Sequence, residues 1–247
     1  MLSYGARAYS LDDVEFLARG GFSFAEIDLK DEVTVRSHSD RLRELSRRCG
    51  IGYLGHGPNE KDPYDVDEIE AHMEPRVNRL LDLAPGLGIR TYTQHLKLDP
   101  RQLDAAAVRR KTAVLRRWCE HAGRLGVTFC IENLSEHSVH FGPAFEAIAQ
   151  LRLTLDVGHG ELLSEVNAAL GFIEEFPDRI HHVHLHDNFG GDSSKSDLHL
   201  PIGRGSIDFA DILRRLVGVG YRGGLCLEVR REHVVEGRER IMRMIGD

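Results

Sequence analysis

The sequence predicts an α/β protein, a single-domain (β/α)8 TIM barrel that covers residues 1–247. The first observation is a repeated pattern in which an amphipathic helix ends near a glycine and a short apolar strand follows. The second is the number of these units, because eight of them in 247 residues match a closed barrel of parallel strands. The third is that the last residues of many strands turn polar, as expected where a barrel carries its site.

The expected strands follow one another along the chain with helical segments between them. Each is short and rich in apolar residues, which is typical of a strand buried under helices. In chain order the segments read LSYGARAY, FSFAEIDL, IGYLGHG, IRTYTQH, VTFCIEN, RLTLDVGH, IHHVHLH and GLCLEV. A doubly wound open sheet is the alternative, but no GxGxxG motif or phosphate-binding P-loop follows any of these strands. No linker or shift in composition indicates a second domain.

Composition and charge narrow the classes of function. The formal net charge of -7 gives no overall attraction to nucleic acid or to an anionic membrane. Four cysteines without CxxC spacing predict buried free thiols rather than disulfides or a zinc knuckle. The N-terminal residues show no signal pattern, and no apolar run approaches the roughly 18 residues of a membrane span. We therefore expect a cytoplasmic protein with no membrane partner.

Alternation within the later strands predicts which side chains face the barrel interior, since successive residues point to opposite sides of a strand. The bulky apolar side chains must cover the helices. The residues between them face the interior and include one ionisable residue near the C-terminal end of each of the last four strands: Glu132, Asp156, His184 and Glu228. His56 and His95, which end the third and fourth strands, share that parity. Active sites of such barrels lie at this end, so we expect a functional cluster there.

The segment 181–199 is the richest in metal-binding and proton-transferring side chains, with five histidines and three aspartates. Three carboxylates and one imidazole at the strand ends form an oxygen-rich site that suits Mn²⁺, Mg²⁺, Co²⁺ or Zn²⁺. We assign structural roles to His181 and His182 and expect His186 and Asp187 to support neighbouring ligands. Asp197 either binds metal or holds a neighbouring histidine.

The strand-end motifs IEN, LDVGH, HVHLHD, DLHLPIGRGSIDF and LEV resemble the xylose isomerase-like TIM barrel superfamily. That superfamily joins sugar phosphate isomerases and epimerases with AP endonucleases of family 2, the endonuclease IV type. The resemblance covers nearly the whole chain and implies that Glu132, Asp156, His184 and Glu228 bind a divalent metal. It also implies that the two glutamates are the catalytic acid and base on opposite sides of the substrate, and that His159 contacts the sugar.

The endonuclease IV-like members hold three zinc ions and use the same four positions together with further ligands. The residues of this chain that match those further ligands are His56, His95, His159, Asp197 and His199. The resemblance therefore fits two templates, a single divalent ion or three Zn²⁺ ions.

Substrate binding is expected from residues beside the metal ligands. His56, His95 and His159 either bind metal or hydrogen-bond the substrate. Arg204 and the backbone amides of the GRGS turn are expected to bind a phosphate group. The alternative for that segment is a tight turn before a helix capped by Ser206 or Asp208.

A sugar isomerase or epimerase acting on a small-molecule sugar or sugar phosphate is the favoured function. A divalent ion on a ketose carbonyl makes the neighbouring C–H more acidic, and a glutamate then removes the proton. Return of the proton to the opposite face gives an epimer, whereas return to the next carbon gives an aldose–ketose isomerisation.

The alternative is a trinuclear zinc phosphodiesterase, an AP endonuclease. The chain is short for a barrel with DNA-gripping insertions and shows no loop where Arg or Lys cluster with aromatics. The segments KDEVTVRSHSDR and PNEKDPYD, both expected to be loops, offer only Arg36, Lys61 and Tyr64 as DNA contacts. A third reading is a barrel that binds a sugar or metal without turnover. The sequence leaves open whether the chain forms a homo-oligomer.

Overall fold

The computed structural model describes residues 2–246 and confirms the predicted barrel. Eight parallel strands pair in sequence order, and β1 pairs with β8 to close the sheet. Each strand is shorter than its predicted segment. The strands are β1 Ser3–Ala8, β2 Phe24–Asp28, β3 Gly52–His56, β4 Thr91–His95, β5 Thr128–Glu132, β6 Arg152–Asp156, β7 Ile180–Leu185 and β8 Gly224–Leu227.

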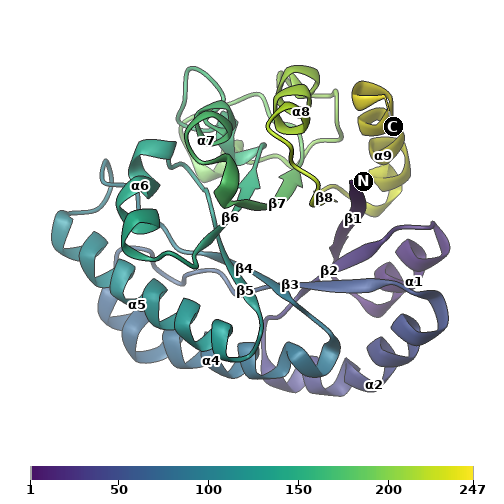
Figure 1. Cartoon of the computed structure of the whole chain (residues 1–247), viewed down its shortest axis with the longest axis horizontal. Helices are drawn as coiled ribbons and strands as arrows, with labels where there is room; N and C mark the ends of the chain where they lie inside the picture. Colours follow the sequence, from purple (N-terminus) through teal and green to yellow (C-terminus); the bar gives the residue numbers. More distant parts are fainter. Residues whose placement is uncertain (1, 247) are drawn as a thin grey trace.

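The helices lie outside the ring of strands (Figure 1). They are α1 Leu11–Arg19, α2 Glu32–Cys49, α3 Val66–Glu68, α4 Glu74–Leu83, α5 Ala105–Arg124, α6 Ser138–Ala147, α7 Ala169–Glu175, α8 Phe209–Gly218 and α9 Val234–Ile245. A π-helical turn, Ile69–Met73, joins α3 to α4, and short 3-10 turns occupy Pro85–Leu87, His159–Glu161, Pro177–Arg179, Ser194–Ser196 and Arg231–His233. Among the described residues, no helix combines the length and the apolar character that crossing a membrane requires.

Helix α2 corrects the expectation that KDEVTVRSHSDR is a loop. The Asp31 side chain accepts a hydrogen bond from the Thr34 backbone N–H at 2.8 Å, which caps the helix directly before Glu32. The apolar residues Val35 and Leu42 are buried on one face, so their spacing is that of an amphipathic helix. The many polar residues between them lie on the solvent face and gave the segment its loop-like composition.

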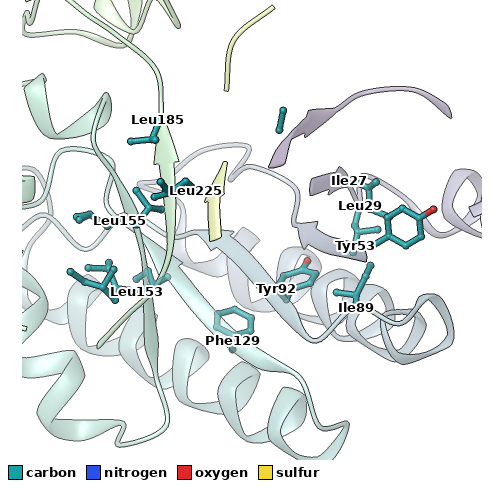
Figure 2. Packing of buried hydrophobic residues seen from close by; sticks show 14 of the residues in the cluster. Ile27, Leu29, Tyr53, Ile89, Tyr92, Phe129, Leu153, Leu155, Leu185 and Leu225 are labelled. Atoms are coloured by element: carbon teal, nitrogen blue, oxygen red, sulfur yellow. The ribbon is translucent and has the colours of Figure 1, made fainter. Parts of the chain in front are cut away.

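The apolar side chains of the strands pack against the helices, as the alternation predicted. Leu153, Leu155 and Leu225 belong to one buried cluster between the sheet and its helical cover (Figure 2). Trp118 of α5 stacks on Phe129 of β5 with ring centroids 5.8 Å apart. Because the outward faces of the strands are fully used in this core, the inward faces are free to carry polar groups.

The barrel interior is polar even below the site. The hydroxyls of Thr93 on β4 and Thr154 on β6 are 2.7 Å apart, which places these two alternate strands face to face across the interior. Both side chains are fully buried. Polar groups in such a position are tolerated because they hydrogen-bond to one another.

The cysteines confirm the predicted free thiols, with one correction. Cys119, Cys130 and Cys226 are buried and free, whereas Cys49 is free but exposed. Cys49 is the last residue of α2, directly before Gly50 ends the helix in a left-handed conformation. A helix terminus faces solvent more readily than the interior of a strand does, so the sequence prediction failed at that position.

Candidate active site

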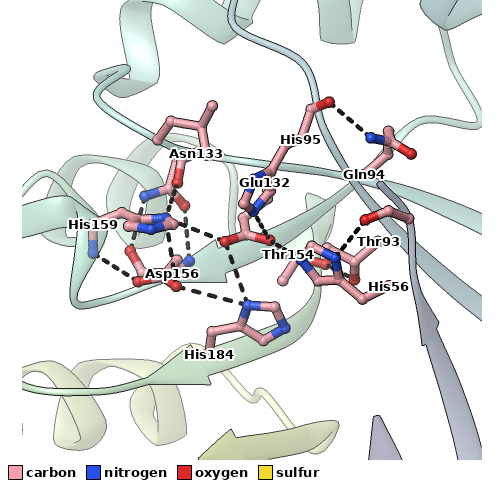
Figure 3. A network of polar contacts seen from close by, with 12 residues as sticks. His56, Thr93, Gln94, His95, Glu132, Asn133, Thr154, Asp156, His159 and His184 are labelled. Atoms are coloured by element: carbon pink, nitrogen blue, oxygen red, sulfur yellow. Dashed lines mark hydrogen bonds and ion pairs between the residues drawn. The ribbon is translucent and has the colours of Figure 1, made fainter. Parts of the chain in front are cut away.

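The polar side chains at the C-terminal ends of β5 to β8 form a cluster around His184 of β7, which is fully buried. Its Nδ1 lies 3.5 Å from Glu132 Oε1, 3.7 Å from Asp156 Oδ2 and 3.3 Å from Glu228 Oε1. The carboxylates come from the ends of β5 and β6 and from the residue that follows β8. Figure 3 shows the side chains of Glu132 and Asp156 directed toward His184. The four residues that alternation placed inward are therefore brought together around one imidazole nitrogen.

Glu26 of β2 determines which nitrogen of His184 faces those carboxylates. Glu26 Oε2 accepts hydrogen bonds from Nε2 of His184 at 2.8 Å and from Nε2 of His182 at 3.1 Å. Burial favours the neutral acid, but the two histidines hold the pKa of Glu26 well below its ordinary value. With Nε2 as its donor, a neutral His184 presents the Nδ1 lone pair to the carboxylates.

Glu26 was missed by the sequence analysis, and His182 was given only a structural role. The available signal was a charged residue between Ala25 and Ile27 in an otherwise apolar strand. The same alternation that selected the later strands would have placed it inward.

The buried donors fit a divalent metal ion. Neither Glu132 Oε1 nor His184 Nδ1 has a hydrogen-bond partner among the described residues, although both atoms are buried. A neutral imidazole lone pair buried against three carboxylates is unfavourable unless a proton or a metal ion lies between them. Burial lowers the pKa of His184, but Glu228 and the other carboxylates outweigh it and raise that pKa well above its ordinary value, so the group attracts positive charge. Three carboxylates and one imidazole suit Mn²⁺, Mg²⁺, Co²⁺ or Zn²⁺.

The second oxygen of Glu132 faces two histidines that end β3 and β4. His56 Nε2 lies 3.1 Å and His95 Nε2 lies 3.0 Å from Glu132 Oε2. His56 Nδ1 donates to the Gly57 carbonyl at 2.9 Å, so the Nε2 of a neutral imidazole is a lone pair. Burial, and then the charge of Arg7, lower the pKa of His56 and favour that neutral form. A second set of metal donors therefore meets the first at Glu132.

A third group surrounds Asp197. Asp197 Oδ2 lies 3.3 Å from His159 Nε2 and 3.1 Å from His199 Nε2. The Nδ1 atoms of these histidines lie 3.0 Å from the Asn133 carbonyl and 2.8 Å from the Glu228 carbonyl, in position to donate to them. Burial lowers the pKa of both histidines, but the nearby carboxylates outweigh it and raise the pKa of His159 well above its ordinary value and that of His199 to about 9. When protonated, both imidazoles donate to Asp197 from Nε2, and in their neutral forms the same atoms are lone pairs that suit a metal ion. His199 has a left-handed backbone with φ of 45°, a strained conformation of the kind that collects at functional sites.

His186 supports the cluster from a neighbouring position, as the sequence analysis expected. Its Nε2 lies 3.1 Å from Asp156 Oδ1. Gly158 of the LDVGH motif leaves room for the His186 ring, because a Cβ at that position would lie 2.1 Å from His186 Cε1. The glycine is therefore required by close packing beside the site.

The segment predicted to bind phosphate lies apart from the cavity. Arg204 is exposed and is not among the described side chains that line it. The amide of Gly203 donates to Asp187 Oδ2 at 2.8 Å, so it is already engaged. Asp208 caps α8 by accepting from Asp211 N. These contacts are those of the alternative interpretation, a tight turn before a helix.

A cavity of about 490 Å³ opens above the buried donors. One part of its wall is formed by the histidines and carboxylates described above. The other part is formed by cationic side chains and an aromatic ring from β1, α4 and the segments that follow β1 and β2. The lining comprises Glu228, His56, His95, His159, Asp197 and His199, together with Arg7, Tyr9, Asp28, Lys30, Gly57, Pro58, Asn59 and Arg76. Glu132, Asp156 and His184, by contrast, are fully buried.

The sequence matches the family described as xylose isomerase-like TIM barrel over residues 10–245. The chain belongs to this family. An uncharacterized protein of Methanocaldococcus jannaschii is 36% identical over 78 residues, which are 32% of this chain and 25% of the relative. A second protein of that organism is 30% identical over 145 residues, 54% of this chain and 50% of the relative. The chain thus spans no more than half the length of either curated relative.

Solved structures resemble the chain along almost its full length. A D-tagatose 3-epimerase-like protein is 21% identical with a TM-score of 0.85, covering 99% of this chain and 97% of that one. L-ribulose 3-epimerase is 19% identical with a TM-score of 0.80, covering 100% and 95%. D-psicose 3-epimerase is 17% identical with a TM-score of 0.78, covering 99% and 100%. At these identities the similarity establishes the shared fold.

Proposed function

We propose that the protein is a divalent-metal-dependent isomerase or epimerase that acts on a sugar or sugar phosphate. The observation that carries the proposal is the position of Glu228, which lines the cavity and lies 3.3 Å from His184 Nδ1. The cavity of about 490 Å³ falls within the roughly 300–1,000 Å³ typical of small-molecule sites. Solved proteins of this fold that are described as sugar 3-epimerases support the same substrate class.

We assign Glu132, Asp156, His184 and Glu228 to hold the ion. When bound, a divalent ion supplies Lewis-acid polarisation of the sugar carbonyl and its neighbouring hydroxyl. Glu228, which faces the cavity, removes the proton from the carbon beside the carbonyl. Glu132, from a non-adjacent strand, returns a proton. Delivery to the opposite face gives an epimer, and delivery to the neighbouring carbon gives an isomer.

Proton exchange with solvent tests this assignment. Turnover of ketoses or ketose phosphates in D₂O is expected to place deuterium on the carbon beside the carbonyl. Glu132→Gln and Glu228→Gln are each expected to lower turnover by roughly 10²–10⁴-fold, the usual contribution of general acid–base catalysis. Glu161→Gln, close to the site but outside the cavity lining, is the matched control. Turnover without incorporation of solvent deuterium would indicate a hydride shift. Near-normal turnover in both variants would show that the site was assigned to the wrong residues.

A trinuclear zinc phosphodiesterase of the AP endonuclease type is the second candidate. It is favoured by the three adjoining donor groups, in which Glu132 is shared between His184 and the pair His56 and His95. Such an arrangement exceeds what a one-metal proton transfer needs. Adjacent ions of this kind activate water and stabilise a leaving oxygen in phosphodiester cleavage.

Metal content separates the two candidates. One ion per chain, retained in His56→Ala, His95→Ala and His199→Ala, supports the sugar enzyme and assigns those histidines to substrate. Close to three ions per chain, with selective losses in these variants and cleavage of an abasic-site oligonucleotide, supports the phosphodiesterase. Elemental analysis of the purified protein gives the count.

A further inference from the structure

One wall of the cavity carries a buried guanidinium. Arg7 of β1 contacts Glu228 Oε1 and Asp28 Oδ1, each at 3.1 Å, and its side chain is 8% exposed. The Arg7 Nε is buried and has no hydrogen-bond partner among residues 2–246. Arg7 nevertheless lines the cavity, so an anion bound there would meet the positive charge of its guanidinium group.

Two further cations lie outward from Arg7 along the same wall. Lys30 Nζ contacts Asp28 Oδ2 at 2.8 Å, and the Lys30 side chain is 66% exposed. Arg76 of α4 donates to the backbone carbonyl of Lys30, from Nε at 3.1 Å and from Nη2. Within the described part of the chain, Arg76 has no carboxylate partner. Once Glu228 is assigned to the metal, Arg7 and Lys30 share Asp28, and Arg76 adds a further positive charge.

Two of the three cations, Arg7 and Lys30, lie near an aromatic ring at the mouth. The Tyr9 ring centroid lies 5.6 Å from the Arg7 guanidinium carbon and 6.0 Å from Lys30 Nζ. Tyr9 is 64% exposed and also lines the cavity. Cation–π contacts of this kind orient charged side chains without neutralising them.

We propose that Arg7, Lys30 and Arg76 form a subsite for the phosphate monoester of the substrate, so that the substrate class is a sugar phosphate rather than a free sugar. The positive surplus on this wall matches a phosphate dianion, and guanidinium groups bind phosphate oxygens with good geometry. Because Arg7 contacts Glu228, the phosphate and the reacting carbon of one small molecule fit within the same cavity. The sugar part of this assignment rests on the proposed function, whereas the binding of phosphate does not.

Phosphate binding to the metal-loaded protein tests the subsite directly. Inorganic phosphate is the probe, titrated calorimetrically at constant ionic strength. The double variant Lys30→Met and Arg76→Met is expected to weaken its binding about 10–100-fold, the effect of removing charge-assisted contacts. The control is Lys61→Met and Arg79→Met, which removes one lysine and one arginine outside the cavity lining. Unchanged phosphate affinity in the Lys30 and Arg76 variant would overturn the subsite, since the anion would then bind the metal.

Matched substrates test the class of molecule. The same variant is expected to lower kcat/KM for a ketose phosphate about 10–100-fold more than for the corresponding free ketose. Phosphate binding that depends on Lys30 and Arg76, with no sugar turned over, supports the anion subsite and rejects the proposed function. An equal loss for both sugars, or a preference for the free ketose, would overturn the sugar phosphate assignment. Oligonucleotide binding that depends on both residues, without preference between the sugars, would also overturn it.

Discussion

At the scale of single residues, histidine hydrogen bonds organise the site. His184 donates to Glu26 from Nε2, whereas His159 and His199 use Nδ1 to reach backbone carbonyls. In each case the remaining nitrogen faces a carboxylate oxygen. Partners that fix a tautomer in this way orient metal-binding imidazoles and raise their basicity.

Glu26→Gln tests this arrangement at one residue. The amide keeps the size of the side chain but removes the charge that Nε2 of His184 faces. We expect the affinity for Mn²⁺, Co²⁺ or Zn²⁺ to fall by about 10–100-fold, the usual effect of losing such a partner. Competition with a chromogenic chelator measures the affinity, and Glu161→Gln is the control. A folded variant with unchanged affinity would reduce Glu26 to a structural role.

At the scale of elements, the loops after β4 and β5 are tied together at the C-terminal end of the barrel. Asp99, fully buried in the first loop, accepts from Ser135 Oγ of the second at 3.0 Å and from Arg101 Nη2 at 2.7 Å. These loops continue from the strands that end at His95 and Glu132. The network therefore fixes the relative position of two site residues through their connecting segments.

Asp99→Asn is expected to lower the free energy of unfolding by roughly 1–3 kcal/mol at neutral pH, the cost of leaving buried partners unsatisfied. Burial raises the pKa of Asp99, but hydrogen bonds from Arg101 outweigh it and lower the pKa from 3.8 to about 2. The folded-state pKa is depressed, so this stabilisation is present above pH 3.8 and is lost as pH falls toward 2. The difference between the two proteins should shrink over that window.

Urea denaturation at neutral pH and near pH 3 measures the difference. Asp40→Asn is the control, because the Asp40 side chain is exposed and its contact with Arg43 is a surface ion pair. A difference between wild type and the Asp99 variant that stays constant with pH would contradict the charge-based explanation.

At the scale of the whole molecule, the site links strands that are distant in sequence. Arg7 and Glu228 are 221 residues apart, yet their side chains contact one another where β1 meets β8. The proposed metal ligands add links between β5, β6, β7 and the end of β8. A bound ion would therefore stabilise the closed barrel as well as support chemistry.

Metal removal is expected to lower Tm by roughly 5–15 °C. A ligand at 100–1,000 times its Kd contributes about 3–4 kcal/mol, and each kcal/mol shifts Tm by about 2–4 °C for a chain of this size. Calorimetry before and after chelation measures the change, and Mn²⁺, Co²⁺ or Zn²⁺ should restore it. The metal would have no part in either candidate function if elemental analysis finds no metal in the protein and added Mn²⁺, Co²⁺ or Zn²⁺ leaves its Tm unchanged.

The barrel and the convergence of four inward strand-end residues were predicted from the sequence alone. Glycines that end helices and the alternation of side chains along strands are local signals. Closure of the parallel sheet into a barrel then brings the C-terminal ends of the strands together. That is why Glu132, Asp156, His184 and Glu228 meet as expected. The prediction of a loop after β2 was wrong, because the polar surface of helix α2 has the composition of a loop.

The tertiary structure decided which further groups join these four residues. Glu26, Arg7 and Arg76 lie far from the last four strands in sequence, and their partners depend on how β1, β2 and α4 pack around the mouth. The tautomers of the histidines also depend on contacts between segments that follow different strands. Charge surplus and lone-pair direction are properties of several side chains in space, so no single segment of sequence contains them.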